Sequence, residues 1–61
     1  MDFLLTYETK LKNSIAEIQT FKWFESEEEL KLFIKTNTQD IHHKIKPIEA
    51  IHILDDRQIS L

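Results

Sequence analysis

Three histidines are the residues of this chain with the clearest capacity for chemistry, because imidazole is a common zinc ligand. His42 and His43 are adjacent, His52 lies further along, and the chain has no cysteine. Adjacent side chains of a strand point to opposite faces, so this spacing does not gather ligands around one ion. We therefore expect solvated histidines, with no bound metal and no cofactor.

Carboxylates gather at two places, and a pair of carboxylates is the machinery of glycoside hydrolysis. The first place runs from Glu25 to Glu29, and the second is Asp55-Asp56. Helix capping explains the first group and turn formation explains the second. The three serines fall in a predicted turn, a helix cap and the C-terminus, where a nucleophile lacks an activating base and a dry pocket. We expect a protein that is not an enzyme.

Aromatic and basic residues alternate at one point, where Lys22 stands between Phe21 and Trp23. Aromatic side chains beside lysines are typical of surfaces that stack single-stranded nucleic acid. Lys10 and Lys12 would add charge across a predicted hairpin, but glutamates lie close by and the net charge is −3. Because phosphate contacts dominate nucleic-acid affinity, a small nucleic-acid-binding or regulatory module is the alternative, and a protein partner is the better prediction.

The composition describes a folded protein and excludes several function classes. Apolar residues make up 41% and charged residues 31% of the 61 residues. No apolar run approaches the roughly 18 residues of a membrane-spanning helix, and the N-terminus lacks the basic start of a secretory signal. Glycine is absent, which excludes glycine-rich phosphate-binding loops. We expect a single domain over residues 1–61, in the cytoplasm and without membrane contact.

The hydrophobic pattern predicts two strands joined by a hairpin at the start of the chain. Residues 2–9 alternate between apolar and polar side chains, which is the signature of a strand with one buried face. Residues 15–24 are rich in β-branched and aromatic residues, but Phe24 lies on one face and Phe21 and Trp23 on the other. This mixed pattern leaves two alternatives open: both faces are partly covered, or a bulge shifts the register.

A helix over residues 27–36 is predicted by a capping box. The Ser26 hydroxyl can accept a hydrogen bond from the backbone N–H of Glu29, whose side chain can reach back. Asn37 is a plausible C-terminal cap. We expect the core between this helix and the sheet to consist of Phe24, Leu30, Phe33 and Ile34.

The remaining residues complete an α+β fold. Residues 38–47 have a weak pattern and end at a proline, so we expect a loop with at most a short helix. Residues 48–54 are strand-like, Asp55-Asp56 predicts a turn, and residues 57–61 a short terminal strand. In a chain without glycine, we expect Asn or Asp at positions of positive φ. The prediction is a small ββαβ(β) antiparallel sheet with one helix packed on one face.

Apolar residues are left over in this arrangement, because one helix covers only one face of a sheet. A chain this small buries only about 60% of its surface, and without cysteine no disulfide can stabilise it. We therefore predict a homodimer, formed through the sheet face or edge that the helix leaves free. The alternative for Trp23, weighted equally, is that it packs in the core. The predicted interface residues are Trp23, Ile51, Ile53 and Ile59.

One pattern spans most of the chain and consists of capping and core residues: Trp23 to Leu30, Phe33-Ile34, and Ile48 to Leu54 with Arg57. It resembles very small ββαβ proteins encoded by phages and prophages of low-GC Gram-positive bacteria. Several phage proteins of this size are counter-defence inhibitors. The resemblance implies a protein-binding inhibitor of a bacterial anti-phage defence system, with a host or defence-system protein as partner in the host cytoplasm. It assigns no site residues.

Overall fold

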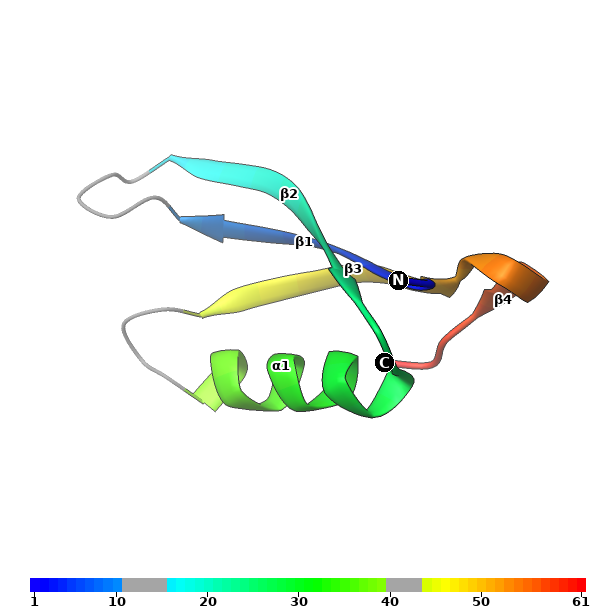
Figure 1. Cartoon of the computed structure of the whole chain (residues 1–61). Helices are drawn as coiled ribbons and strands as arrows, with labels where there is room; N and C mark the ends of the chain where they lie inside the picture. Colours follow the sequence, from blue (N-terminus) through cyan, green and yellow to red (C-terminus); the bar gives the residue numbers. More distant parts are fainter. Residues whose placement is uncertain (11–15, 40–43) are drawn as a thin grey trace.

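The computed structural model of this chain describes residues 1–10, 16–39 and 44–61. Its strands form one antiparallel sheet in the order β2-β1-β3-β4, and α1 lies against one face of it (Figure 1). The α+β fold class predicted from the sequence is confirmed. The elements are β1 (Phe3–Lys10), β2 (Glu17–Phe24), α1 (Glu27–Gln39), β3 (Ile45–His52), the 3-10 helix η1 (Ile53–Asp55) and β4 (Arg57–Gln58).

Side chains of the central strand β1 alternate between the two faces of the sheet. Leu5 is fully buried on the face that packs against α1, with Ala50 of β3 opposite it. Leu4 points to the other face, where its neighbours across the sheet are Trp23 of β2 and Ile51 of β3. We call this second face, which α1 does not cover, the open face.

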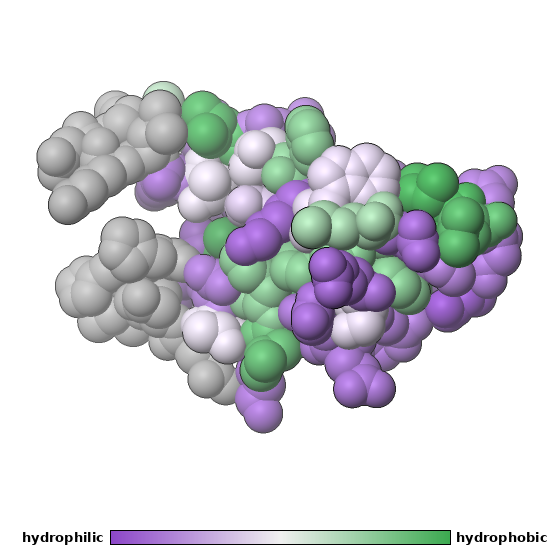
Figure 2. All heavy atoms as spheres, in the orientation of Figure 1, coloured by the Kyte–Doolittle hydropathy of each residue, from purple (hydrophilic) through white to green (hydrophobic). Residues whose placement is uncertain are grey.

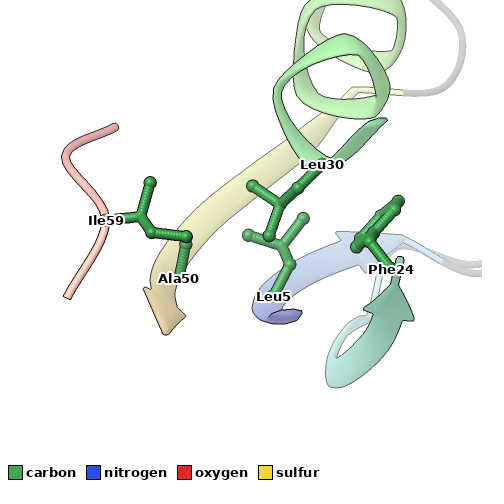
Figure 3. Packing of buried hydrophobic residues seen from close by; sticks show 5 residues of the cluster. All are labelled: Leu5, Phe24, Leu30, Ala50 and Ile59. Carbon is green, nitrogen blue, oxygen red and sulfur yellow. The ribbon is translucent and has the colours of Figure 1, made fainter. Parts of the chain in front are cut away.

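The core lies between α1 and the sheet (Figure 3). Leu30 of α1 and Leu5 of β1 point toward one another, and both are fully buried. Full burial of an aliphatic side chain is worth about 1.5–3 kcal/mol, so these contacts fasten the helix to the sheet. The predicted core is confirmed, although two of its members are only half-buried. The cluster is completed by Phe24, Ala50 and Ile59, with Phe3, Tyr7, Phe33 and Ile34 packed against it.

The N-terminus of α1 is capped as predicted, but the helix ends later than predicted. The backbone N–H of Glu29 donates to Ser26 Oγ at 3.1 Å. The prediction of Asn37 as a C-terminal cap is wrong, because Asn37 lies within the helix and its Nδ2 donates to the Phe33 carbonyl at 2.7 Å. Thr38 Oγ1 donates to the Ile34 carbonyl at 2.8 Å. Both side chains thus bind carbonyls one turn earlier in α1, which continues to Gln39.

Strand β2 is regular, and neither alternative for its mixed pattern holds. Its pairing with β1 runs without interruption over all eight residues. The bulge occurs elsewhere, between β1 and β3. Phe21 is 61% exposed on the open face, so that face is not covered either.

Strand β3 begins earlier than predicted, and the expectation of a loop through Pro47 is wrong. Tyr7 of β1 lies opposite Pro47, while the preceding Thr6 lies opposite Glu49, so Ile48 is an extra residue. Proline is tolerated in a sheet at such a bulge, because the regular ladder is already interrupted there. The earlier start brings Ile45 into the strand, where it is buried and 7% exposed.

The C-terminal turn is confirmed, but the strand before it ends earlier than predicted and the strand after it is shorter than predicted. Residues Ile53–Asp55 form η1 in place of the end of a strand. Asp56 follows with φ of 53°, the positive φ expected of an aspartate in a chain without glycine. Strand β4 then spans two residues in place of the predicted five.

Candidate protein-binding surface

An apolar patch occupies one end of the open face. Trp23, Leu4 and Ile51 form a row across the three longest strands, since Leu4 lies opposite both of the others. Phe21 lies two residues before Trp23 on β2 and therefore on the same face. Phe21 and Trp23 are 61% and 40% exposed, and Leu4 and Ile51 are half-buried. We call these four residues the open-face patch.

The other end of the open face is charged. Lys46 Nζ of β3 donates to Glu17 Oε1 of β2 at 2.9 Å, across β1. This hydrogen bond and the attraction of the two charges lower the pKa of Glu17 and raise the pKa of Lys46. Glu8 lies between them on β1. The open-face patch thus has a polar border toward the β1–β2 hairpin.

The structure brings together only two of the four predicted interface residues. Trp23 and Ile51 lie in one row of the open-face patch, and the alternative in which Trp23 belongs to the core is wrong. Ile53 is 47% exposed but lies in η1, outside the strands that build the patch. The prediction that Ile59 lies on the uncovered side is wrong. The backbone N–H of Ile59 donates to the Ala50 carbonyl at 2.8 Å. The Ile59 side chain lies in the core and is 4% exposed.

Sequence reasoning missed Leu4 and Phe21 as members of this surface. The signal was present in the alternation of β1 and β2. Once Leu5 and Phe24 face the helix, their neighbours of the opposite parity must face away. Which pairs become neighbours across the sheet depends on the register, which the sequence did not specify.

A shallow groove of about 500 Å³ opens between β2 and α1. Figure 2 shows apolar atoms exposed at the level between the strands and the helix. Lys22 is one of its polar residues, and its Nζ lies 4.7 Å from the centre of the Phe33 ring. The apolar residues that line the groove are Met1, Trp23, Phe24, Leu32 and Phe33.

The stacking platform considered for nucleic acid is assembled only in part, because Lys10 lies on the open face opposite Glu17, Lys12 lies outside the described residues, and Lys22 lies on the other face. Lys22 lies opposite Leu5 of β1 and so faces the helix, whereas Phe21 and Trp23 face away from it. The lysine and the two aromatic rings are thus on opposite faces of the sheet. A base stacked on the open face would find no phosphate contact from Lys22.

The histidines form no metal site within residues 1–10, 16–39 and 44–61, where no three His, Asp or Glu side chains come together as a metal-binding group. His42 and His43 lie outside the described residues. The ring of His52 stacks on Phe3 at a centroid distance of 4.3 Å. Its Nδ1 lies 2.9 Å from Asp55 Oδ1, without the geometry of a hydrogen bond. His52 therefore packs against Phe3, its neighbour across the sheet.

The carboxylates near the helix start have structural partners. Glu27 contacts Lys31 Nζ at 3.2 Å and Arg57 Nη2 at 3.1 Å. Hydrogen bonds from Lys31 and then Arg57 lower the pKa of Glu27, which keeps it ionised. This network ties α1 to β4. The Glu27 carboxylate is therefore already paired with two cations.

Comparison with known proteins gives no match to a family model, a curated protein or a solved structure. Among the helices of the described residues, none has the length and apolar character needed to cross a membrane. The open-face patch and the groove are the two exposed apolar surfaces that the described residues form.

Proposed function

We propose that this chain is a non-enzymatic protein-binding protein, and that the open-face patch is its contact surface for a partner protein. The observation that carries the proposal is the exposure of Phe21 and Trp23, 61% and 40%, side by side on a sheet face that no element of the described residues covers. A cluster of exposed apolar side chains on a small protein is typical of an interaction site. Tryptophan is also among the residues that most often dominate binding energy.

The geometry suits a flat contact with a polar border. A partner that covers Phe21 and Trp23 removes aromatic surface from water at about 25 cal/mol per Å². The half-buried Leu4 and Ile51 extend the apolar centre across the sheet. Glu17 and Lys46 lie at the border, where exposed charges influence the association rate and the choice of partner more than the affinity.

In its most concrete form, the proposal is a phage-encoded inhibitor that occupies a surface of a bacterial anti-phage defence protein in the host cytoplasm. A small chain can inhibit in this way without chemistry of its own, because covering a surface requires only affinity. The resemblance to small phage proteins supports this form, and the open-face patch supplies the surface. The partner is then a host or defence-system protein.

The experiment is a capture from lysate of a low-GC Gram-positive bacterium, with and without nuclease, and at low salt and at 0.5 M salt. The bait variants are the wild type, Phe21→Ser on the open face and, as the matched control, Leu32→Ser. Leu32 is also an exposed apolar residue, 63% accessible, but it belongs to the helix layer. We expect the wild type and the control to retain the same protein, and Phe21→Ser to lose it.

Two outcomes would contradict the proposal. Capture that nuclease or 0.5 M salt abolishes would favour the nucleic-acid alternative, because phosphate contacts weaken steeply with salt. Capture that survives Phe21→Ser and fails with Leu32→Ser would move the contact from the open face to the groove. Thermal melts of the three baits check that each is folded.

A further inference from the structure

The two edges of the sheet are built differently. At one edge, β2 pairs with β1 over eight residues, and within the described residues no strand pairs with its other side. Every second residue of such an edge strand directs its backbone N–H and C=O away from the sheet, ready to pair. Strand β2 contains no proline and no bulge. This edge is therefore not protected by a proline or a bulge.

The opposite edge has the features that prevent further pairing. The short strand β4 covers Ile51 and His52, and the Ile59 N–H binds the Ala50 carbonyl. Beyond them, Pro47 lacks a backbone donor and the bulge at Ile48 interrupts the ladder. Prolines and bulges at an edge are known means of blocking pairing between sheets. Only the β2 edge lacks them.

Charge does not protect the β2 edge either. Lys22 is the only charged residue of Ile18–Phe24. Its ammonium lies over the Phe33 ring at 4.7 Å and the Phe24 ring at 5.6 Å. The lysine is therefore held against the helix layer, where it leaves the edge accessible.

We propose that the β2 edge pairs with the β2 edge of a second copy of this chain, in antiparallel orientation around a two-fold axis at Phe21. The product is a dimer with one continuous eight-stranded sheet and both helices on the same face. The proposal does not depend on the partner protein proposed above, because it concerns the edge of the sheet and leaves the open face uncovered.

Symmetry restricts the register. A two-fold axis perpendicular to the sheet keeps each face on its own side, so directly opposed residues must have the same parity. With the axis at Phe21, Gln19 lies opposite the partner's Trp23 on the open face. On the helix face, Ile18 lies opposite the partner's Phe24. Pairing then covers Ile18–Phe24 of each copy.

The groove is the reason for choosing this register. Ile18 is 36% exposed on the helix face, at the far end of β2 from the groove. In the dimer it meets the partner's Phe24, which lines the partner's groove. The exposed Ile18 of each copy thus lies beside the groove of the other copy, where Phe24 itself is 7% exposed. An axis at Thr20 would instead place Ile18 opposite the partner's Lys22, so Ile18 would not meet the partner's Phe24.

The dimer also adds to the open-face patch. Phe21 of the two copies would be direct neighbours across the axis, with Trp23 of each copy two residues further on. Aromatic neighbours across strands contribute roughly 0.2–1 kcal/mol to pairing. Two copies of the open-face patch would then form one continuous apolar strip on the same side of the dimer.

Single-cysteine cross-linking tests the proposal directly, because the chain has no cysteine of its own. With the axis at Phe21, Phe21→Cys places two thiols on directly opposed residues, whose Cα atoms lie about 4.5–5.5 Å apart. A disulfide spans that distance. Gln19→Cys is the matched control, because its two copies would lie roughly 14 Å apart, beyond the reach of a disulfide. We expect rapid cross-linking of Phe21→Cys under mild oxidation and none of Gln19→Cys.

The unmodified chain provides the second readout. Sedimentation at high micromolar concentration should give about twice the chain mass of 7.3 kDa. Ile18→Lys should raise the dissociation constant of the dimer at least tenfold, since it places a second ammonium beside the partner's Lys22, whose ammonium already lies over the Phe24 ring. A 7.3 kDa particle together with no cross-link at Phe21→Cys would overturn the proposal.

Other outcomes are equally decisive. A cross-link at Thr20→Cys in place of Phe21→Cys would overturn the register. Equal cross-linking at positions 19, 20 and 21 would indicate random collision and overturn it as well. These measurements use the purified chain alone, so a monomer that still captures a partner protein refutes only the dimer. A dimer that captures nothing refutes only the binding function.

Discussion

The two faces of the sheet come from the same strands and the same alternation of side chains, yet one face is buried and the other is exposed. On the helix face, Leu5 and Leu30 are fully buried. On the open face, Phe21 and Trp23 remain exposed to water. The difference teaches that the residues that hold the fold together are separate from those that we propose to bind a partner. Each set can therefore be changed without the other.

The largest effect should come from truncation of the helix face. Leu30→Ala removes a fully buried side chain and leaves a cavity, which costs about 3 kcal/mol or more in the free energy of unfolding. In a domain of this size that shifts the melting temperature by well over 10 °C, at roughly 4–8 °C per kcal/mol. Thermal denaturation followed by circular dichroism measures it. A shift of only a few degrees would show that Leu30 is not central to the core.

The matching change on the open face should have little effect on stability. We expect Phe21→Ala to change the free energy of unfolding of the monomer by less than about 0.5 kcal/mol, as exposed positions do. If the chain dimerises through β2, the comparison belongs at low concentration, where the dimer dissociates. A loss close to that of Leu30→Ala would mean that the two faces are not separate.

The helix cap is expected to contribute an intermediate amount. Ser26→Ala removes the acceptor of the Glu29 N–H and should cost about 1 kcal/mol of unfolding free energy. Ser26→Asp is the matched control, because it retains an acceptor and should stay close to the wild type. Urea denaturation of the three proteins separates these values. Equal stability of Ser26→Ala and the wild type would contradict the role of the cap.

The smallest effect should be the dependence of stability on pH. The pKa values of Glu17 and Glu27 are lowered in the folded chain by their hydrogen bonds to cations. Their stabilising contributions are therefore complete above the ordinary carboxyl pKa of 4.5 and are lost as the pH falls through the lowered folded pKa values. We expect a small fall in melting temperature as the pH is lowered below 4.5, because exposed ion pairs contribute little. Lys46→Gln should remove the part of this pH dependence of the melting temperature that comes from Glu17.

Much of the helix face could be predicted from the sequence, because local patterns determine it. The cap at Ser26 and the spacing of Leu30, Phe33 and Ile34 specify the helix and its buried side. The α+β order followed from the same periodicities. Such signals lie within a few residues of one another, so they do not require knowledge of the tertiary structure.

What could not be predicted depends on pairing over long distances. Ile59 is buried because its backbone binds Ala50, and no local pattern reveals that contact. Pro47 lies in a strand because a bulge in the pairing with β1 accommodates it. The row of Trp23, Leu4 and Ile51 likewise exists only once the register is known. The candidate surface was therefore half predicted, through Trp23 and Ile51.

The most direct test of the central claim follows the environment of Trp23 when the captured partner is added. Trp23 is the only tryptophan of the chain, so 5-fluorotryptophan labelling gives one fluorine resonance whatever the partner contains. The account predicts that saturating partner shifts this resonance and removes its sensitivity to solvent, while a label placed on the helix at Leu32 changes little. Binding that leaves the Trp23 resonance and its solvent exposure unchanged would contradict the claim that the open face is the binding surface.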